Sequence, residues 1–191
     1  MRKIATFTFL SVDGYYTGPR GEIDWFKEIK KDDEYDAFTH AGSRSGGALI
    51  FGRTTYEMMK SYWPTADAMK NDPSMAEVVN NNKKIVFSRT LENADEGPHW
   101  KNIELKREIQ SQEIIRLKEE EGKDITILGS GSIVQQLANL HLIDEYQIVI
   151  IPVVLGVGKY LFAGVDALNL QLLEARSFKN GIVWLSYRLE K

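Results

Sequence analysis

The chain has 191 residues, 43% hydrophobic and 27% charged, which predicts one globular domain over residues 1–191 with a substantial core. Its net charge of -3 predicts no general attraction to nucleic acid or to an anionic membrane. The absence of cysteine excludes disulfides and thiolate metal sites. The three histidines lie far apart, so no metal site is expected, with a hard cation held by carboxylates alone as the alternative. No apolar run reaches membrane-spanning length and no signal peptide is evident, so a cytoplasmic protein is expected.

The first predicted strand, residues 4–12, leads into a long loop. This loop runs from Asp13 to Trp25 and contains three glycines and a proline. Glycine-rich loops that follow a strand often cover a ligand, although a plain surface connection is the alternative. The aromatic rings of Tyr16 and Trp25 could stack on a planar ligand there. A helix is then predicted from residue 32 to about residue 41, with acidic residues in its first turn.

A second strand is predicted at residues 48–52, where an apolar run without alternation indicates cover on both faces. A helix opens directly after it at Arg53, so bare helix amides are expected at the end of this strand. Residues 65–73 are expected to be irregular and residues 74–82 to form a short helix. Residues 84–87 predict another strand, which the Ser88-Arg89-Thr90 turn closes.

The next region contains a strand, a glycine-serine turn and a helix. An edge strand at residues 103–105 and an amphipathic helix at 112–121 precede it. Residues 125–128 then form a buried strand, and Gly129-Ser130-Gly131-Ser132 leads into a helix. Bare first-turn amides and the helix dipole would bind a phosphate there; a tight turn without a ligand is the alternative. Val134 replaces the third glycine of G-x-G-x-x-G, which disfavours an ordinary Rossmann dehydrogenase.

The carboxyl-terminal part predicts antiparallel structure. A strand at residues 144–154 and a glycine-bearing loop precede two strands, at residues 170–178 and 182–189. These two strands flank Asn180-Gly181, a strong hairpin signal because both positions accept positive φ. Apolar residues occur on both sides of the hairpin, which predicts a two-fold dimer through it or through the adjoining strand.

Alternating strands and helices predict a mostly parallel sheet whose strand ends share one edge. Four loops would meet there, because each follows a predicted parallel strand. Arg53 and Arg89 each follow directly on a strand, so both should lie at this edge. Since ligands of open α/β sheets bind at that edge, the sequence favours a nucleotide with more than one phosphate group.

Five motifs in order carry a resemblance to a known family: Asp13-Gly14, Phe51-Gly52-Arg53-Thr54-Thr55-Tyr56, Phe87-Ser88-Arg89, Gly129-Ser130-Gly131-Ser132, and Pro152 to Phe162. Together they resemble the dihydrofolate reductase-like superfamily, with a closer likeness to the reductase domain of bacterial riboflavin biosynthesis and its small single-domain relatives. The resemblance covers nearly the whole chain. It implies an α/β three-layer sandwich with a mostly parallel central sheet and an antiparallel carboxyl-terminal hairpin. It also implies NADPH as cofactor and a homodimer.

The same resemblance implies roles for individual residues. Cofactor contacts would be made by Gly52, Arg53 and Thr54 at a phosphate, by Ser88 and Arg89 at the adenosine ribose and its 2′-phosphate, and by Gly129, Ser130, Gly131, Ser132 and Ile133 at the pyrophosphate. Tyr16, Trp25 and Tyr56 are the expected substrate contacts. Asp13 is a candidate proton donor, with a turn residue as the alternative.

Two features of the family are not matched in this sequence. Folate reductases carry an acid early in the first helix, for which Asp24, Asp32 and Asp33 are all candidates here. The additional basic residues with which riboflavin-type reductases bind a ribosyl phosphate have no counterpart. The sequence therefore predicts an NADPH-dependent reductase acting on a C=N or C=O bond of a small pterin- or pyrimidine-like heterocycle. The alternative is a non-catalytic nucleotide- or ligand-binding protein with the same fold.

Overall fold

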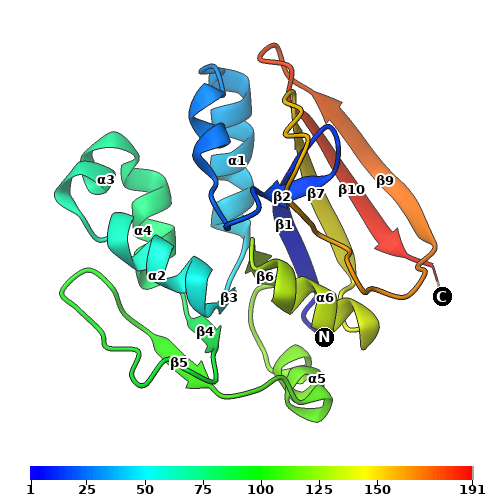
Figure 1. The fold of residues 1–191 in the computed structure, drawn as a ribbon. Helices are drawn as coiled ribbons and strands as arrows, with labels where there is room; N and C mark the ends of the chain where they lie inside the picture. The colour runs from blue at the N-terminus through cyan, green and yellow to red at the C-terminus, as the bar shows by residue number, and fades with distance from the viewer. Residues whose placement is uncertain (191) are drawn as a thin grey trace.

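The computed structural model describes residues 1–190, apart from the side chains of residues 27, 28, 44 and 45. The strands of its large sheet are β1 (Ile4–Ser11), β3 (Leu49–Gly52), β4 (Lys84–Phe87), β5 (Ile103–Lys106), β6 (Ile125–Leu128), β7 (Glu145–Ile151), β9 (Leu170–Ser177) and β10 (Val183–Leu189). Their order is β5-β4-β3-β6-β1-β7-β10-β9 (Figure 1). In this order, each neighbouring pair from β5 across β4, β3, β6 and β1 to β7 is parallel, whereas β10 is antiparallel to both β7 and β9. The predicted sheet and hairpin are thus confirmed.

Helices cover both faces of this sheet, which makes three layers. They are α1 (Asp33–Ser45), α2 (Arg53–Tyr62), α3 (Ala66–Asn71), α4 (Pro73–Asn81), α5 (Ser111–Glu119) and α6 (Gly131–Asn139), with a short 3-10 helix η1 (Asp24–Glu28). One face packs against Ile114 and Leu117 of α5 and the apolar side of α6. The other face packs against α1, α2 and α4. In residues 1–190, no helix combines the length and the apolar character needed to cross a bilayer.

The α1/α2 face of the sheet carries two separate apolar clusters. One lies around η1, α1 and the β7–β10 strands and includes Trp184. The other lies around α2 and α4 over β3 and β4. Phe7 and Phe9 of β1 pack against the first cluster and Leu128 of β6 packs against the second, and all three are only half-buried. Phe7 and Leu128 are register partners, so the three side chains share this face. We call them the β1–β6 strip.

The expectation of irregular chain between residues 65 and 73 is wrong in part. Helix α3 forms there because the Thr65 side chain accepts a hydrogen bond from the Ala68 amide. The Asp72 side chain then caps α4, and Pro73 occupies its first turn. Two further strands, β2 (Tyr15–Thr17) and β8 (Lys159–Tyr160), pair as a small separate sheet within segments expected to be loops.

A fully buried lysine joins α4 to the β4–β5 half of the sheet. The Lys84 ammonium donates to the carbonyls of Asn80, Asn82 and Lys101, each at 2.9 Å, and lies 4.4 Å from the Trp100 ring centroid. Burial lowers the pKa of this ammonium to about 8. The Asn80 carbonyl also accepts the Lys101 amide at 3.1 Å, so the ammonium joins a hydrogen-bond network between the end of α4 and the segment that precedes β5.

Candidate functional site

Four loops meet at one edge of the sheet, as the alternation of strands and helices predicts. The parallel strands β1, β3, β4 and β6 all end there, with Gly52 beside Phe87 in the register. Three contacts link the loops to one another: Tyr16 to Gly131, Ser130 to Gly52, and Arg53 to Thr90. We call this edge the carboxyl edge.

Ser130 connects the turns that start α2 and α6. Its backbone is left-handed, with φ 55° and ψ 62°, an uncommon conformation for a residue other than glycine. Its Oγ accepts a hydrogen bond from the Gly52 amide at 2.8 Å and donates to Thr55 Oγ1 at 2.9 Å. The hydroxyl is therefore already engaged by protein groups, and its position holds the two turns together.

Both helices begin without a side-chain cap at this edge. Gly52 is the N-cap of α2 and Ser130 that of α6, and neither supplies a side-chain hydrogen bond to its helix. First-turn amides such as those of Gly131 and Ser132 have no intrahelical acceptor. The Ile133 amide instead bonds to the Ser130 carbonyl, and its side chain lies in the core. Bare amides thus face the carboxyl edge from two helices.

The two arginines both lie exposed at this edge but differ in their contacts. Arg53 donates to Thr90 Oγ1 at 2.8 Å and pairs with Glu57 at 3.3 Å. Arg89 forms no hydrogen bond or ion pair with any residue between 1 and 190, so its guanidinium is available to a ligand. The neighbouring Ser88 is buried, and its hydroxyl oxygen accepts hydrogen bonds from the amides of Thr90 and Leu91. Ser88 therefore shapes the turn that presents Arg89.

Tyr16 lies against the first residue of α6. A Cβ placed on Gly131 would come within 2.4 Å of Tyr16 Cζ and 2.6 Å of its hydroxyl. Only glycine permits this contact without movement of the ring. Tyr16 also packs against the core on the α5/α6 face, away from the β1–β6 strip. The structure thus places Tyr16 beside the predicted phosphate seat and not with the other expected substrate contacts.

Asp13 ties the loop after β1 to the loop after β7. Its carboxylate accepts the amides of Leu155 at 3.1 Å and Gly156 at 2.8 Å. A hydrogen bond from the Ser11 side chain and these backbone amides hold the pKa of Asp13 below its usual value. An acid that ionises this readily is a poor proton donor near neutral pH. Both carboxylate oxygens are thus engaged by loop amides, as in a turn residue, and a role of Asp13 as proton donor stays a prediction.

The β1–β6 strip is the part of the site that the sequence analysis missed. Phe9 contacts Phe26 of η1, with ring centroids 4.9 Å apart, and Phe7 packs edge-on against Phe9. Half-buried aromatic rings next to the carboxyl edge offer a flat apolar surface to a ligand. The alternation along β1 was the available signal, since Phe7 and Phe9 share a side that Ile4 and Leu10 do not.

Two aromatic residues expected at the substrate lie in the core instead. Tyr56 is 2% exposed and packs with Val79 and Trp100 between α2, α4 and the sheet. Its ring has no free face, so we leave Tyr56 out of the site. Trp25 is 9% exposed and packs on Phe26, so it supports the ring that contacts the strip without itself offering a surface.

Asp32 and Asp33, two of the three acids considered from the sequence, are engaged elsewhere. Asp32 caps α1 and also accepts the Asn180 amide at 3.1 Å, and Asp33 pairs with Lys31 on the surface. Asp36, one turn into α1, is half-buried and forms no hydrogen bond or ion pair through its carboxylate with the described residues.

Asp36 lies on the side of α1 that faces α4. It shares a helix face with His40, four residues later, whose Nε2 is 2.9 Å from Asp72 at the start of α4. The third candidate, Asp24, lies in the first turn of η1. Asp36 is thus the acid of α1 that remains available to a ligand between the two helices.

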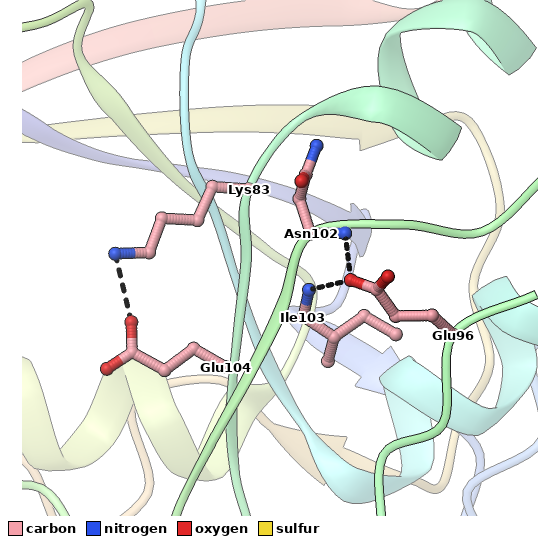
Figure 2. Close-up of a pocket in the computed structure, with 5 residues that line it drawn as sticks. All are labelled: Lys83, Glu96, Asn102, Ile103 and Glu104. Atoms are coloured by element: carbon pink, nitrogen blue, oxygen red, sulfur yellow. Dashed lines mark hydrogen bonds and ion pairs between the residues drawn. The ribbon is translucent and has the colours of Figure 1, made fainter.

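Two hollows lie beside β4 and β5, the first of them away from this edge. The first, about 300 Å³, is lined by Lys83, Glu96, Asn102, Ile103 and Glu104 (Figure 2). Lys83 pairs with Glu104 at 2.9 Å, and Glu96 accepts the amides of Asn102 and Ile103. The second, about 210 Å³, lies between these strands and α5. The first hollow opens at the starts of β4 and β5, where its charges are mutually satisfied, so we do not assign it to the site.

No group of three or more histidine, cysteine, aspartate or glutamate side chains among the described residues could hold a metal ion.

Comparison with known proteins places the chain in a family. Residues 2–184 match the model of the RibD C-terminal domain. The chain is 30% identical over 187 residues to YyaP of Bacillus subtilis, an uncharacterised protein, covering 97% of this chain and 94% of YyaP.

Three solved structures share the fold. A riboflavin biosynthesis protein from Shewanella sp. PV-4 superposes with a TM-score of 0.77 at 22% identity, covering 99% of both chains. A Thermotoga maritima diaminohydroxyphosphoribosylaminopyrimidine deaminase/5-amino-6-(5-phosphoribosylamino)uracil reductase gives 0.66 at 17%, over 99% of this chain and 57% of that one. Dihydrofolate reductase from Enterococcus faecalis, complexed with NADP(H), gives 0.60 at 15%, over 99% and 97%. The protein therefore has the dihydrofolate reductase-like fold and belongs to the RibD C-terminal domain family.

Proposed function

We propose that the protein is an NADPH-dependent reductase of a small planar heterocycle, of the pyrimidine or pterin class. The observation that carries the proposal is the carboxyl edge. There, two uncapped helix starts held together by Ser130 lie next to the exposed Arg53 and Arg89. Structural relatives named as reductases, one of them holding NADP(H), support the same assignment.

The residues at this edge fit a dinucleotide with an additional phosphate. The bare amides of Gly131 and Ser132 would bind the pyrophosphate, and the start of α2 at Gly52, Arg53 and Thr54 would bind a phosphate. Arg89 presents a planar set of donors suited to a 2′-phosphate. NADPH supplies a hydride for reduction of a C=N or C=O bond when bound. Ser88 and Ser130 take part through the turns they hold, because their hydroxyls are already engaged.

The substrate would lie on the β1–β6 strip. Phe7 and Phe9 would contact its flat face, and Asp36 would accept hydrogen bonds from ring or amino N–H groups. The strip lies on the α1/α2 face at the same end of the sheet as the bare amides, so the two ligands would meet at the carboxyl edge. The protein's part in the reaction is then orientation and exclusion of water.

A second candidate function is nucleotide or ligand binding without turnover. One observation favours it: Asp13, the acid expected to donate a proton, has a lowered pKa and both carboxylate oxygens bonded to loop amides. A binding protein with this fold needs no proton donor.

NADPH titration followed by its fluorescence, and then addition of dihydrofolate or 5-amino-6-(5-phosphoribosylamino)uracil, separates the two functions. The reductase oxidises NADPH with at least one such substrate, whereas the binding protein holds NADPH and oxidises none. Failure to bind NADPH or NADH would contradict both the reductase and a nucleotide-binding protein. The absorbance spectrum of the purified protein tests for a flavin in the same place.

A further inference from the structure

The ring of Tyr16 lies where a phosphate group would approach the start of α6. Its Cζ and hydroxyl are so close to Gly131 that the glycine has room for no Cβ on that side. A ligand whose oxygens approach the backbone of Gly131 from this side meets the ring first. In the conformation seen here, the tyrosine and such a ligand compete for the same space.

We propose that Tyr16 is a movable cover of the nucleotide site, which lies on Gly131 in the ligand-free protein and leaves it when phosphate groups bind. The inference rests on the proposed function, because it is a nucleotide that displaces the ring. It also changes the role of Tyr16 from a substrate contact to a control on cofactor entry.

The contacts of Tyr16 allow it to move. Its ring is half-buried, and its hydroxyl forms no hydrogen bond with any residue described in the structure. Burial raises the pKa of this hydroxyl, so it stays neutral at physiological pH and gains no charge that would hold it in place. Leaving Gly131 therefore costs packing contacts and no hydrogen bond.

The strand that carries Tyr16 is held by its other side. Tyr15 stacks on Tyr160 with ring centroids 4.3 Å apart, and their hydroxyls are 2.9 Å apart. Because side chains alternate along a strand, Tyr15 and Tyr16 point in opposite directions from β2. The β2–β8 pair and the Asp13 contacts can thus stay in place while the Tyr16 side chain turns away.

If only a fraction of the molecules is open, the apparent Kd equals the intrinsic Kd divided by that fraction, so the cover weakens binding. Tyr16→Ala removes the ring, and we expect it to tighten NADPH binding by about three- to tenfold and to speed association. Tyr16→Phe keeps the ring, so its Kd stays within about twofold of the wild type. If the hydroxyl were instead a phosphate ligand, Tyr16→Phe would weaken binding. Tyr62→Ala, an exposed tyrosine at the end of α2, is the matched control.

Amide hydrogen exchange in the ligand-free proteins tests the cover without a nucleotide. We expect exchange at residues 131 and 132 to be faster in Tyr16→Ala than in the wild type, Tyr16→Phe and Tyr62→Ala. Unchanged exchange in Tyr16→Ala, or NADPH affinity that stays equal or falls in this variant, would overturn the proposal. If exchange rises but none of the four proteins binds NADPH, the proposed function fails, whereas the Tyr16 ring is still shown to shield the amides of residues 131 and 132.

Discussion

The Ser130 side chain accepts a hydrogen bond from the Gly52 amide at 2.8 Å, which joins the turn after β6 to the turn after β3. Both residues are buried. Removing the hydroxyl would leave the Gly52 amide without a partner, which costs about 1–3 kcal/mol. The left-handed backbone at Ser130 adds strain of about 1 kcal/mol that glycine would not have.

We therefore expect the free energy of unfolding to be highest for the wild type, lower for Ser130→Gly and lowest for Ser130→Ala. Both variants should also bind NADPH more weakly, because the two helix starts are no longer held at a fixed separation. Urea unfolding and NADPH titration measure the two effects. A Ser130→Ala protein as stable as the wild type would show that the hydrogen bond contributes nothing.

Arg89 should distinguish NADPH from NADH. Losing one charge-assisted contact costs about 1.5–3 kcal/mol, or about ten- to a hundredfold in affinity. Arg89→Ala should weaken NADPH binding by this factor and leave NADH nearly unchanged, since Arg89 has no partner within residues 1–190 whose loss would disturb the fold. Equal losses for both cofactors would mean that Arg89 does not contact the 2′-phosphate.

Asp36→Asn tests the substrate part of the site. A neutral amide keeps the shape but accepts hydrogen bonds more weakly, so we expect kcat/KM for the heterocycle to fall by about ten- to a hundredfold. The Kd for NADPH should change little, because Asp36 lies on the side of α1 that faces α4. Asp33→Asn, at an exposed acid three residues earlier, is the control. A similar loss in both variants would argue against a specific role for Asp36.

Asp32 should make stability depend on acid pH. Burial pushes the pKa of this carboxyl up, but the amides of Tyr35, Asn180 and Glu34 outweigh it, so the folded-state pKa lies below the unfolded value. The contribution of the Asp32 carboxylate to the free energy of unfolding is thus present above the unfolded-state pKa, about 3.9, and is lost as the pH falls through the folded-state pKa. Asp32→Ala should lower Tm at about pH 7 and differ less from the wild type at about pH 3. Thermal unfolding at both pH values measures this. A Tm difference that does not narrow would contradict it.

The hairpin should form a two-fold dimer. The sequence predicts that both faces of the hairpin need cover from outside the domain core. On one face, however, Trp184 of β10 is covered by α1 of the same chain. Leu172 and Leu173 of the outer strand β9 remain about half exposed, at 50% and 48%. An exposed apolar edge strand favours association. Light scattering at micromolar concentration should give a dimer mass, and Leu172→Lys should shift it toward the monomer. A monomeric wild type would rule this out.

The sequence predicts the frame of this site better than its contents. The shared edge of the parallel strands, the hairpin and the two arginine turns follow from the alternation of strands and helices and from turn chemistry. The role of Tyr56 does not, because periodicity cannot tell which face of α2 packs on Val79 and Trp100. The sequence likewise does not single out Asp36 as the available acid of α1. Asp32 looks equally suitable until the structure shows that it accepts the amide of Asn180, a residue far along the chain.

The buried ammonium of Lys84 makes this residue an internal reporter. An amine-reactive reagent cannot reach a nitrogen that is fully enclosed and bonded to three carbonyls. Acylation of Lys84 therefore requires the packing of α4 against β4 and β5 to open. The rate at which this lysine is modified measures the opening of the half of the sheet that carries Arg53 and Arg89. Its slowing by a bound nucleotide would show that the ligand stabilises that half.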